Sequence, residues 1–147
     1  SFVHGHTYGG NPLSAAVSLA VIKILEEEKL AENARVVGDY LLRQLQEKIL
    51  PFSFVGDVRG IGLMLGVELV QDKATKEPFP LQQHIAAKLT QTMIRHGVII
   101  YPGSGNAKDG NGDHFLLTPP LIITKTQVDE LMDKMVAGFR EFEASLK

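Results

Sequence analysis

VGDVRGIGLMLGVELV, from Val55 to Val70, is the segment that most constrains the architecture of this chain. It consists mainly of apolar and β-branched residues, with glycines at positions 56, 60, 62 and 66. This pattern predicts a strand, a tight turn or bulge at Arg59-Gly60, and a longer second strand from Leu63 to Leu69. Two strands joined by so few residues pair as antiparallel neighbours.

Further elements are expected on the C-terminal side of this strand pair. Residues 71–80 are polar and contain two prolines, which predicts a surface loop. After this loop we expect a helix over 81–96 that ends at Gly97, a strand over 98–101, a strand over 114–118, and a helix from Thr124 or Thr126 to about Leu146. The segment PGSGNAKDGNG, residues 102–112, is the most flexible loop by composition.

Two helices are expected before Pro51. The first covers Leu13 to Glu28 and is apolar around most of its circumference, which predicts burial on more than one side. The second covers Leu30 to Lys48 and carries one apolar stripe. Because the first helix is too apolar for a small domain to bury alone, we expect it to pack partly against a part of the protein outside this sequence.

The expected order of elements is helix, helix, strand, strand, helix, strand, strand, helix. Strands that are grouped, and do not alternate strictly with helices, favour an α+β fold. Its sheet is expected to be small and largely antiparallel, with helices packed on one face, and to be preceded by a long helical segment. We therefore divide the chain into a loop with two helices, residues 1–50, and a small α/β domain, residues 51–147.

The composition is that of an ordinary globular protein, and it narrows the classes of function. Of the 147 residues, 44% are hydrophobic and 22% are charged, and the formal net charge of −2 gives no reason to expect nucleic acid or a membrane as partner. The absence of cysteine excludes disulfides, thiolate metal sites and thiol chemistry, and is compatible with the cytoplasmic location that we expect. The sequence starts at Ser1 without an initiator methionine, so we expect it to be a piece of a larger protein.

The N-terminal loop HGHTYGGNP, residues 4–12, runs directly into the first helix, with Asn11 as the expected N-cap and Pro12 at the expected first helical position. A glycine-rich loop with a hydroxyl residue before a helix can bind an anion, because amide donors and the positive end of the helix dipole point outward there. Thr7 is the candidate for such a contact, and the alternative is that it only shapes the turn. No acidic or cysteine ligand lies near His4 and His6, so loop-shaping histidines are favoured and no metal ligand is assigned.

Three segments follow one another along the chain: HGHTY with Asn11-Pro12, then VGDVRGIGLMLGVELV, then GDHFLLTPPLIIT before the last amphipathic helix. Together they resemble the C-terminal part of class III aminotransferases, and within these the omega-transaminase branch. Members of this family are fold type I enzymes that depend on pyridoxal phosphate. The resemblance implies that residues 1–50 hold the cofactor-phosphate loop and the helices that lead in from the large domain, and that residues 51–147 form the small domain.

The same resemblance assigns roles to individual residues. It implies that the hydroxyl and amide of Thr7 and the amide of His6 bind the phosphate of pyridoxal phosphate in the active site of a second subunit of a homodimer. The lysine that binds the cofactor covalently, and the acid that pairs with its ring nitrogen, lie in the large domain of such enzymes. No catalytic residue is therefore expected in this chain.

Arg59 is the candidate substrate-binding residue. Its planar guanidinium could clamp a substrate carboxylate, or it could belong to the framework with Asp57 or Glu68 as its partner. Many family members bind the substrate carboxylate with an arginine shortly before the Pro-Pro pair, but residues 96–124 contain no arginine. Recognition would then come from Arg59, from the large domain, or from a lysine such as Lys108, unless the donor is an amine without a carboxylate at that position.

We therefore expect the full-length protein to be an aminotransferase that moves an amino group between an amine or amino acid donor and a keto acid or aldehyde. Its partners would be its own large domain, a second subunit and small amine or keto acid substrates, and this chain would be inactive alone. The same scaffold is compatible with a related pyridoxal phosphate reaction, as in an aminomutase, racemase or decarboxylase.

The alternative from another class is an autonomous α+β module that binds a small anion or has a regulatory role. The two hypotheses differ in the apolar helix near the N-terminus. A piece of an enzyme exposes the apolar face of residues 13–25 or buries it in a dimer, whereas an autonomous module buries it within one chain.

Overall fold

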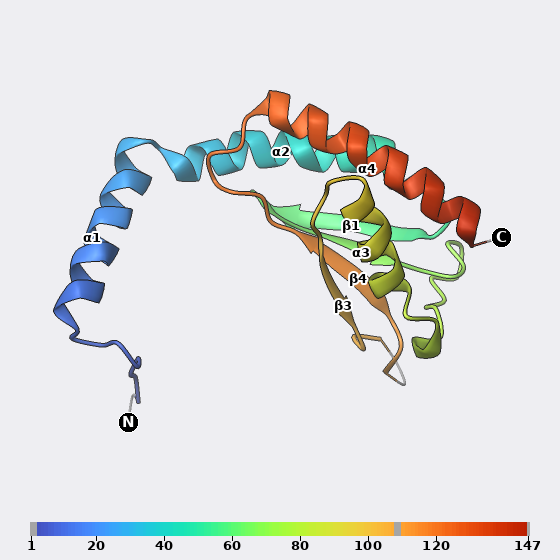
Figure 1. The fold of residues 1–147 in the computed structure, drawn as a ribbon, viewed down its shortest axis with the longest axis horizontal. Helices are drawn as coiled ribbons and strands as arrows, with labels where there is room; N and C mark the ends of the chain where they lie inside the picture. The colour runs from blue at the N-terminus through green and yellow to red at the C-terminus, as the bar shows by residue number, and fades with distance from the viewer. Residues whose placement is uncertain (1–2, 108–109, 147) are drawn as a thin grey trace.

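The computed structural model describes residues 3–107 and 110–146. Helix α1 projects away from the sheet and from the helices that cover it (Figure 1). The elements are α1 (Pro12–Glu27), α2 (Leu30–Lys48), β1 (Val55–Ile61), β2 (Met64–Leu69), η1 (Leu81–Gln83), α3 (Ile85–Arg95), β3 (Tyr101–Ser104), β4 (Asp113–Leu117) and α4 (Lys125–Ser145).

The four strands form one sheet in the order β1-β2-β4-β3, and every neighbouring pair is antiparallel. Helix α4 packs against α2 and α3 and lies along α2, while α2 packs against β1, α3 packs against β3 and β4, and α4 reaches the sheet through Phe139 (Figure 1). Within the described residues, the other face of the sheet carries a groove and no helix. The predicted α+β fold, with a small antiparallel sheet and helices on one face, is confirmed.

The alternation of side chains along the strands sorts residues between the two faces of the sheet. Val58, Val67 and Phe115 are register partners across β1, β2 and β4, and all three are buried under the helices. One position further along, Arg59 and Leu116 belong to a row that points to the helix-free face. This two-residue period therefore fixes which residues are available for binding.

Phenylalanine rings form the centre of the core. Phe139 of α4 has no exposed surface, and its ring centroid lies 5.3 Å from that of Phe54, 5.4 Å from that of Phe52 and 6.0 Å from that of Phe115. These rings come from the helix layer, from the connection before β1 and from the sheet, so their contacts join the layers of the domain.

The hairpin turn lies at Gly62-Leu63, and the prediction of a turn or bulge at Arg59-Gly60 is wrong. Strand β1 continues through Arg59, which pairs with Gly66, to Ile61. Gly62 adopts a positive φ of 54°, which a turn requires and glycine tolerates best. The irregularity of the ladder lies instead between Val55 and Asp57, where the carbonyl of Gly56 accepts a hydrogen bond from Lys76.

Two further boundaries differ from the prediction. The strand expected over 98–101 is found three residues later, as β3 at Tyr101–Ser104. Residues 98–100 are partly buried but do not pair with another strand, and the pairing of β3 continues into the segment that was expected to be a loop. The expected helix over 81–96 starts as the single turn η1 and is interrupted at His84, whose φ of 50° is left-handed. The regular helix α3 begins only after this residue.

The start of the last helix is confirmed at Thr124, the first of the two predicted caps. The Thr124 hydroxyl accepts a hydrogen bond from the Gln127 amide at 3.3 Å, and the Gln127 side chain accepts one from the Thr124 amide at 3.0 Å. This reciprocal pair is a capping box, which the sequence spacing of threonine and glutamine signals.

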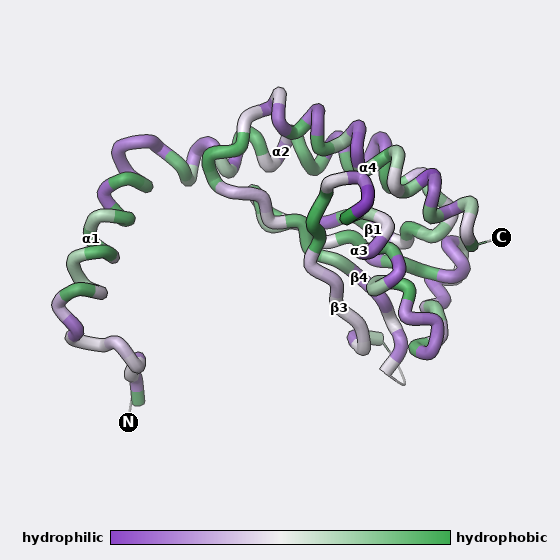
Figure 2. Tube along the Cα trace, viewed as in Figure 1, coloured by the Kyte–Doolittle hydropathy of each residue, from purple (hydrophilic) through white to green (hydrophobic). Residues whose placement is uncertain are grey.

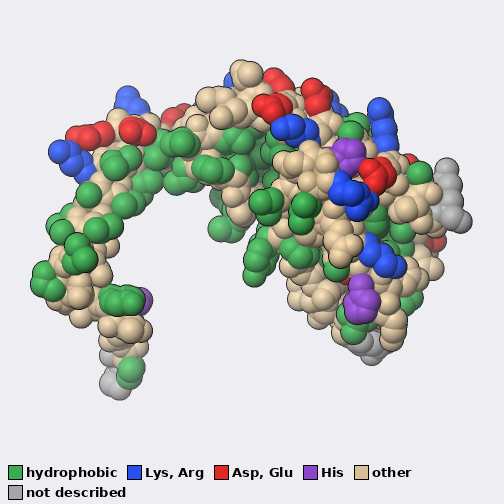
Figure 3. Space-filling view, viewed as in Figure 1, with side chains coloured by type: hydrophobic (Ala, Val, Ile, Leu, Met, Phe, Trp, Pro, Cys, Tyr) green, Lys and Arg blue, Asp and Glu red, His purple; other side chains and the backbone are tan. Residues whose placement is uncertain are grey.

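Helix α1 is apolar but is not buried within this chain. None of its residues is buried in this chain, although Leu13, Leu19 and Ile22 are apolar and are 75%, 68% and 50% exposed. Hydrophobic residues recur along the whole helix in Figure 2, and Figure 3 shows hydrophobic side chains facing the hollow between α1 and the sheet. Exposed apolar surface on this scale marks an interaction site, as expected of a piece of an enzyme and not of an autonomous module.

No helix in the described part of the chain combines the length and the apolar character that crossing a membrane would need.

Candidate functional site

The N-terminal loop is exposed and is shaped by its own backbone. The Gly9 amide donates to the His6 carbonyl at 2.9 Å, and the Asn11 amide donates to the Tyr8 carbonyl at 3.0 Å. Gly10 adopts a φ of 77°, which lets the chain reverse before the helix. Thr7 lies inside this double turn, so its side chain is presented on a short, ordered loop.

The loop ends in a well-formed helix start. The Asn11 side chain accepts a hydrogen bond from the Ser14 amide at 3.0 Å, and Pro12 is the first helical residue. The predicted cap and first residue of this helix are therefore confirmed. The Thr7 amide and hydroxyl make no hydrogen bond within the described residues, so both remain available as donors.

These donors suit a phosphate group. A phosphate dianion is best bound by several uncharged donors near a helix start, and the loop offers a hydroxyl and free amides there. The rings of His4 and His6 meet edge to face, 4.7 Å between centroids, so the two histidines contact each other. No group of three or more His, Asp or Glu side chains in the described residues is arranged to hold a metal ion.

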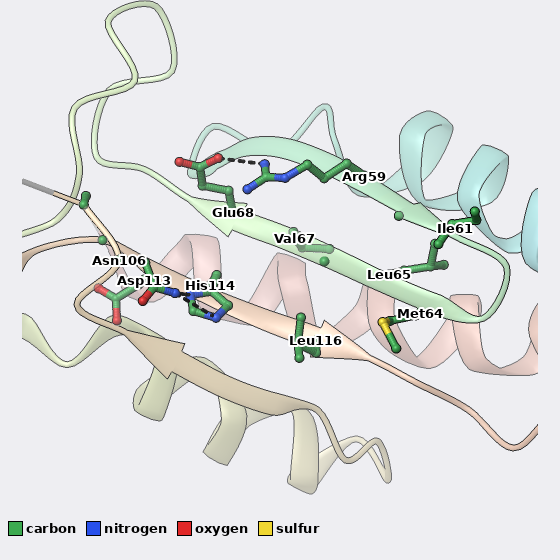
Figure 4. A pocket seen from close by; sticks show the side chains of 14 residues that line it. Arg59, Ile61, Met64, Leu65, Val67, Glu68, Asn106, Asp113, His114 and Leu116 are labelled. Carbon is green, nitrogen blue, oxygen red and sulfur yellow. Dashed lines mark hydrogen bonds and ion pairs between the residues drawn. The ribbon is translucent and has the colours of Figure 1, made fainter. Parts of the chain in front are cut away.

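Arg59 belongs to β1, which lies far from the N-terminal loop (Figure 1), and its side chain lies on the helix-free face of the sheet (Figure 4). Its Nη1 lies 2.5 Å from Oδ2 of Asp57 and 3.0 Å from Oε2 of Glu68. The hydrogen bonds that the Arg59 guanidinium donates to these two carboxylates, first to Asp57 and then to Glu68, raise the pKa of Arg59 above its usual value. The guanidinium charge is thus already compensated by two acids, although the side chain is 67% exposed.

A groove of about 650 Å³ runs over this face of the sheet. Arg59, Glu68 and His114 line its polar end, and Met64 and Leu116 line its apolar end (Figure 4). Gly66 lies between the two ends, where the lack of a side chain opens the floor of the groove. The groove can therefore accept a group that is polar at one end and apolar at the other.

A second groove, of about 640 Å³, lies between α2, the β1–β2 hairpin and the segment around Pro119. Its wall is positioned by Asn33, whose side-chain amide donates to the carbonyls of Leu121 at 2.6 Å and Ile123 at 3.1 Å. Met64 lines both grooves. Sequence reasoning singled out neither Asn33 nor Met64, because the contact of Asn33 joins residues about 90 positions apart and leaves no local signal.

The predicted site residues therefore lie in two separate parts of the structure. His6 and Thr7 share the loop before α1, while Arg59 lines the first groove and pairs with Asp57 and Glu68, its two predicted partners. Lys108, the other candidate for carboxylate recognition, lies outside the described residues.

Known proteins resemble this chain in sequence and in fold. Residues 1–139 match the family model described as aminotransferase class-III. An uncharacterized aminotransferase of Schizosaccharomyces pombe is 42% identical over 129 residues, which cover 88% of this chain and 28% of that protein. The mitochondrial alanine–glyoxylate aminotransferase 2 homolog 2 of Arabidopsis thaliana is 44% identical over 134 residues, 88% of this chain and 26% of that protein.

Solved structures show the same relationship. A transaminase from the marine bacterium Virgibacillus matches the whole chain with a TM-score of 0.85 and 37% identity, over 32% of its own length. An (S)-enantioselective omega-transaminase from Thermomicrobium roseum matches 97% of the chain with a TM-score of 0.79 and 38% identity, over 30% of its own length. The chain thus spans about a quarter to a third of the length of the proteins that it matches.

Proposed function

Because this chain belongs to the class III aminotransferases, we propose that it acts as the C-terminal part of a longer enzyme that depends on pyridoxal phosphate. That enzyme moves an amino group between an amine or amino acid donor and a keto acid or aldehyde acceptor. The single observation that carries this proposal is the family match over residues 1–139, and the fold likeness to transaminases supports it. A cytoplasmic location is part of the proposal.

The proposal divides the chain between the two domains of the enzyme. Residues 1–50 supply the phosphate loop and the helices that lead out of the large domain, and residues 51–147 form the small domain. The exposed apolar side chains of α1 support this division, because they need a partner that this chain does not supply. We propose that the large domain and a second subunit cover this helix in a homodimer.

In this enzyme His6 and Thr7 bind the cofactor phosphate. The Thr7 hydroxyl and amide and the His6 amide donate hydrogen bonds to phosphate oxygens, and the start of α1 adds a favourable field. The distance of this loop from the rest of the chain supports a contact made in the active site of the partner subunit. The cofactor, when bound, supplies an electron-accepting ring that stabilises negative charge on the substrate carbon, while this loop fixes its position.

Replacing Thr7 by valine should weaken the binding of pyridoxal phosphate to the longer enzyme. The variant keeps the shape of the side chain and removes one hydrogen bond to a charged group, which contributes about 1.5–3 kcal/mol, or roughly a 10- to 150-fold change in Kd. Titration of the cofactor-free enzyme with pyridoxal phosphate, followed by absorbance, measures this change. Thr126→Val, at an exposed position of α4, is the matched control and should leave Kd unchanged. An unchanged Kd in Thr7→Val would remove Thr7 from the phosphate site.

Arg59 has two candidate roles, and its ion pairs with Asp57 and Glu68 favour the framework role over a substrate contact. We therefore expect Arg59→Lys to leave the KM of carboxylate-bearing donors close to that of the parent enzyme. The loss of stability should stay below about 1 kcal/mol, because the pairs are largely exposed. Steady-state kinetics with a carboxylate-bearing and a carboxylate-free donor test this. A KM increase confined to the carboxylate-bearing donor would instead assign Arg59 to substrate binding.

A further inference from the structure

The four asparagines of this chain differ in the backbone amide that follows each of them. Asn11 precedes Pro12, which has no N–H, and Asn33 precedes a residue of α2, where amides are bonded within the helix. The residue after Asn106 is Ala107, whose amide donates to the carbonyl of Asn111 at 2.8 Å. These three following positions are therefore poor nucleophiles.

Asn111 is different. It is half-buried just before β4, and it precedes Gly112, whose amide donates no hydrogen bond within the described residues. Gly112 has no Cβ to block the approach of its nitrogen to the neighbouring side chain. The Asn111 Oδ1 accepts a hydrogen bond from the Leu81 amide at 3.1 Å, so a donor already lies where negative charge would develop on that oxygen.

We propose that Asn111 is a site of spontaneous deamidation, a self-catalysed modification that consumes only water. The Gly112 nitrogen attacks Cγ of Asn111 and forms a five-membered cyclic imide. The bond from Cγ to Nδ2 breaks, and Nδ2 leaves as ammonia with the proton given up by the Gly112 amide. Water then adds to one of the two ring carbonyls and opens the ring, which leaves aspartate or isoaspartate at position 111.

The two products have different structural consequences. Asn111 holds η1 through the Leu81 amide, and Asp113 holds α3 by accepting from the Ala86 amide at 3.1 Å. An aspartate keeps an oxygen that can accept from Leu81. An isoaspartate places one extra carbon in the main chain between these two anchors, so their spacing no longer fits the segment that they hold. Each event also adds one negative charge to a chain whose formal net charge is −2.

Peptide mapping tests this proposal on the longer protein that contains this chain. The folded protein is incubated at mildly alkaline pH and body temperature, with a sample in denaturant kept in parallel, and tryptic cleavage after Lys108 separates Asn111 from Asn106. Each deamidation adds about 1 Da to the peptide that carries it. We expect folding to suppress conversion at Asn106 and to leave conversion at Asn111 close to its rate in denaturant, with isoaspartate assigned to position 111 by fragmentation of the peptide that has gained mass.

Two variants complete the design. Asn111→Gln keeps an amide and should abolish the mass gain in the folded protein. Asn111→Asp supplies the aspartate product directly and should keep a melting temperature close to that of the fresh protein, whereas aged protein enriched in isoaspartate should melt lower. The proposal is overturned if folding protects Asn111 as strongly as it protects Asn106, or if Asn111→Gln gains mass as fast as the parent protein.

Discussion

Replacing Phe139 by alanine should lower the free energy of unfolding by about 3–5 kcal/mol, the largest effect that we expect of any single substitution. Phe139 has no exposed surface and contacts Phe52, Phe54 and Phe115, which belong to different layers. The substitution removes buried apolar area and leaves a cavity, and surroundings that come from separate elements cannot collapse to fill it. Denaturant unfolding followed by circular dichroism measures the loss.

Ile94→Ala is the matched control for this prediction. Ile94 is also an apolar helical residue, but it is 57% exposed, so its truncation should change stability by less than about 0.5 kcal/mol. Should Phe139→Ala fail to fold, Phe139→Leu keeps most of the volume, and a loss of about 1–2 kcal/mol is expected. Equal losses for Phe139→Leu and Ile94→Ala would mean that Phe139 does not join the layers as described.

Replacing Gly38 by alanine should destabilise the fold by about 2–3 kcal/mol, even though alanine favours helix by up to about 1 kcal/mol. A Cβ at Gly38 would overlap the main chain of Gly62, at the hairpin turn between β1 and β2. Backbone atoms cannot rotate away as a side chain can, so either α2 or the hairpin has to shift. Thermal and denaturant unfolding of the variant measure this cost.

Gly66→Ala gives the matched control, because Gly66 lies in the same hairpin. A Cβ there would meet Leu116 at 3.7 Å and the carbonyl of Arg59 at 3.9 Å, which are ordinary contacts. Its stability should change by less than about 1 kcal/mol, and alanine is the better strand residue of the two. If Gly66→Ala were as destabilising as Gly38→Ala, the close approach of α2 to the hairpin would not be the cause.

The regular elements could be predicted where the signal is local. A cap at Thr124 or Thr126 could be predicted from a threonine before an amphipathic run, and the antiparallel pairing of β1 and β2 from two apolar runs with a short connection. The hairpin turn could not be placed from the sequence, because the single glycines at positions 60 and 62 offer the same local freedom. The position of the turn depends on a residue far away in the sequence, because Gly38 of α2 packs against Gly62.

The candidate site, too, could be predicted from the sequence only in part. The loop before α1 could be predicted as a helix start from Asn11 and Pro12, and the acidic partners of Arg59 from its neighbours in the strand pair. The two grooves could not be predicted, because they form where the strands, α2 and the segment around Pro119 meet. The exposure of α1 within this chain could be predicted from its apolar circumference, but which partner covers it could not, because the sequence indicates burial and not the surface that provides it.

The most direct test of the proposed function is an amino-transfer assay on the longer protein that contains this chain. The protein is supplied with pyridoxal phosphate, a mixture of amine and amino acid donors labelled with ¹⁵N, and pyruvate together with other keto acids and aldehydes, and alanine and the other aminated products are analysed for the label. We expect labelled alanine or another labelled product to form only when pyridoxal phosphate is present, and none to form with this 147-residue chain alone. Cofactor-loaded longer protein that transfers no label to any keto acid or aldehyde acceptor, or turnover by the 147-residue chain alone, would contradict the proposed function.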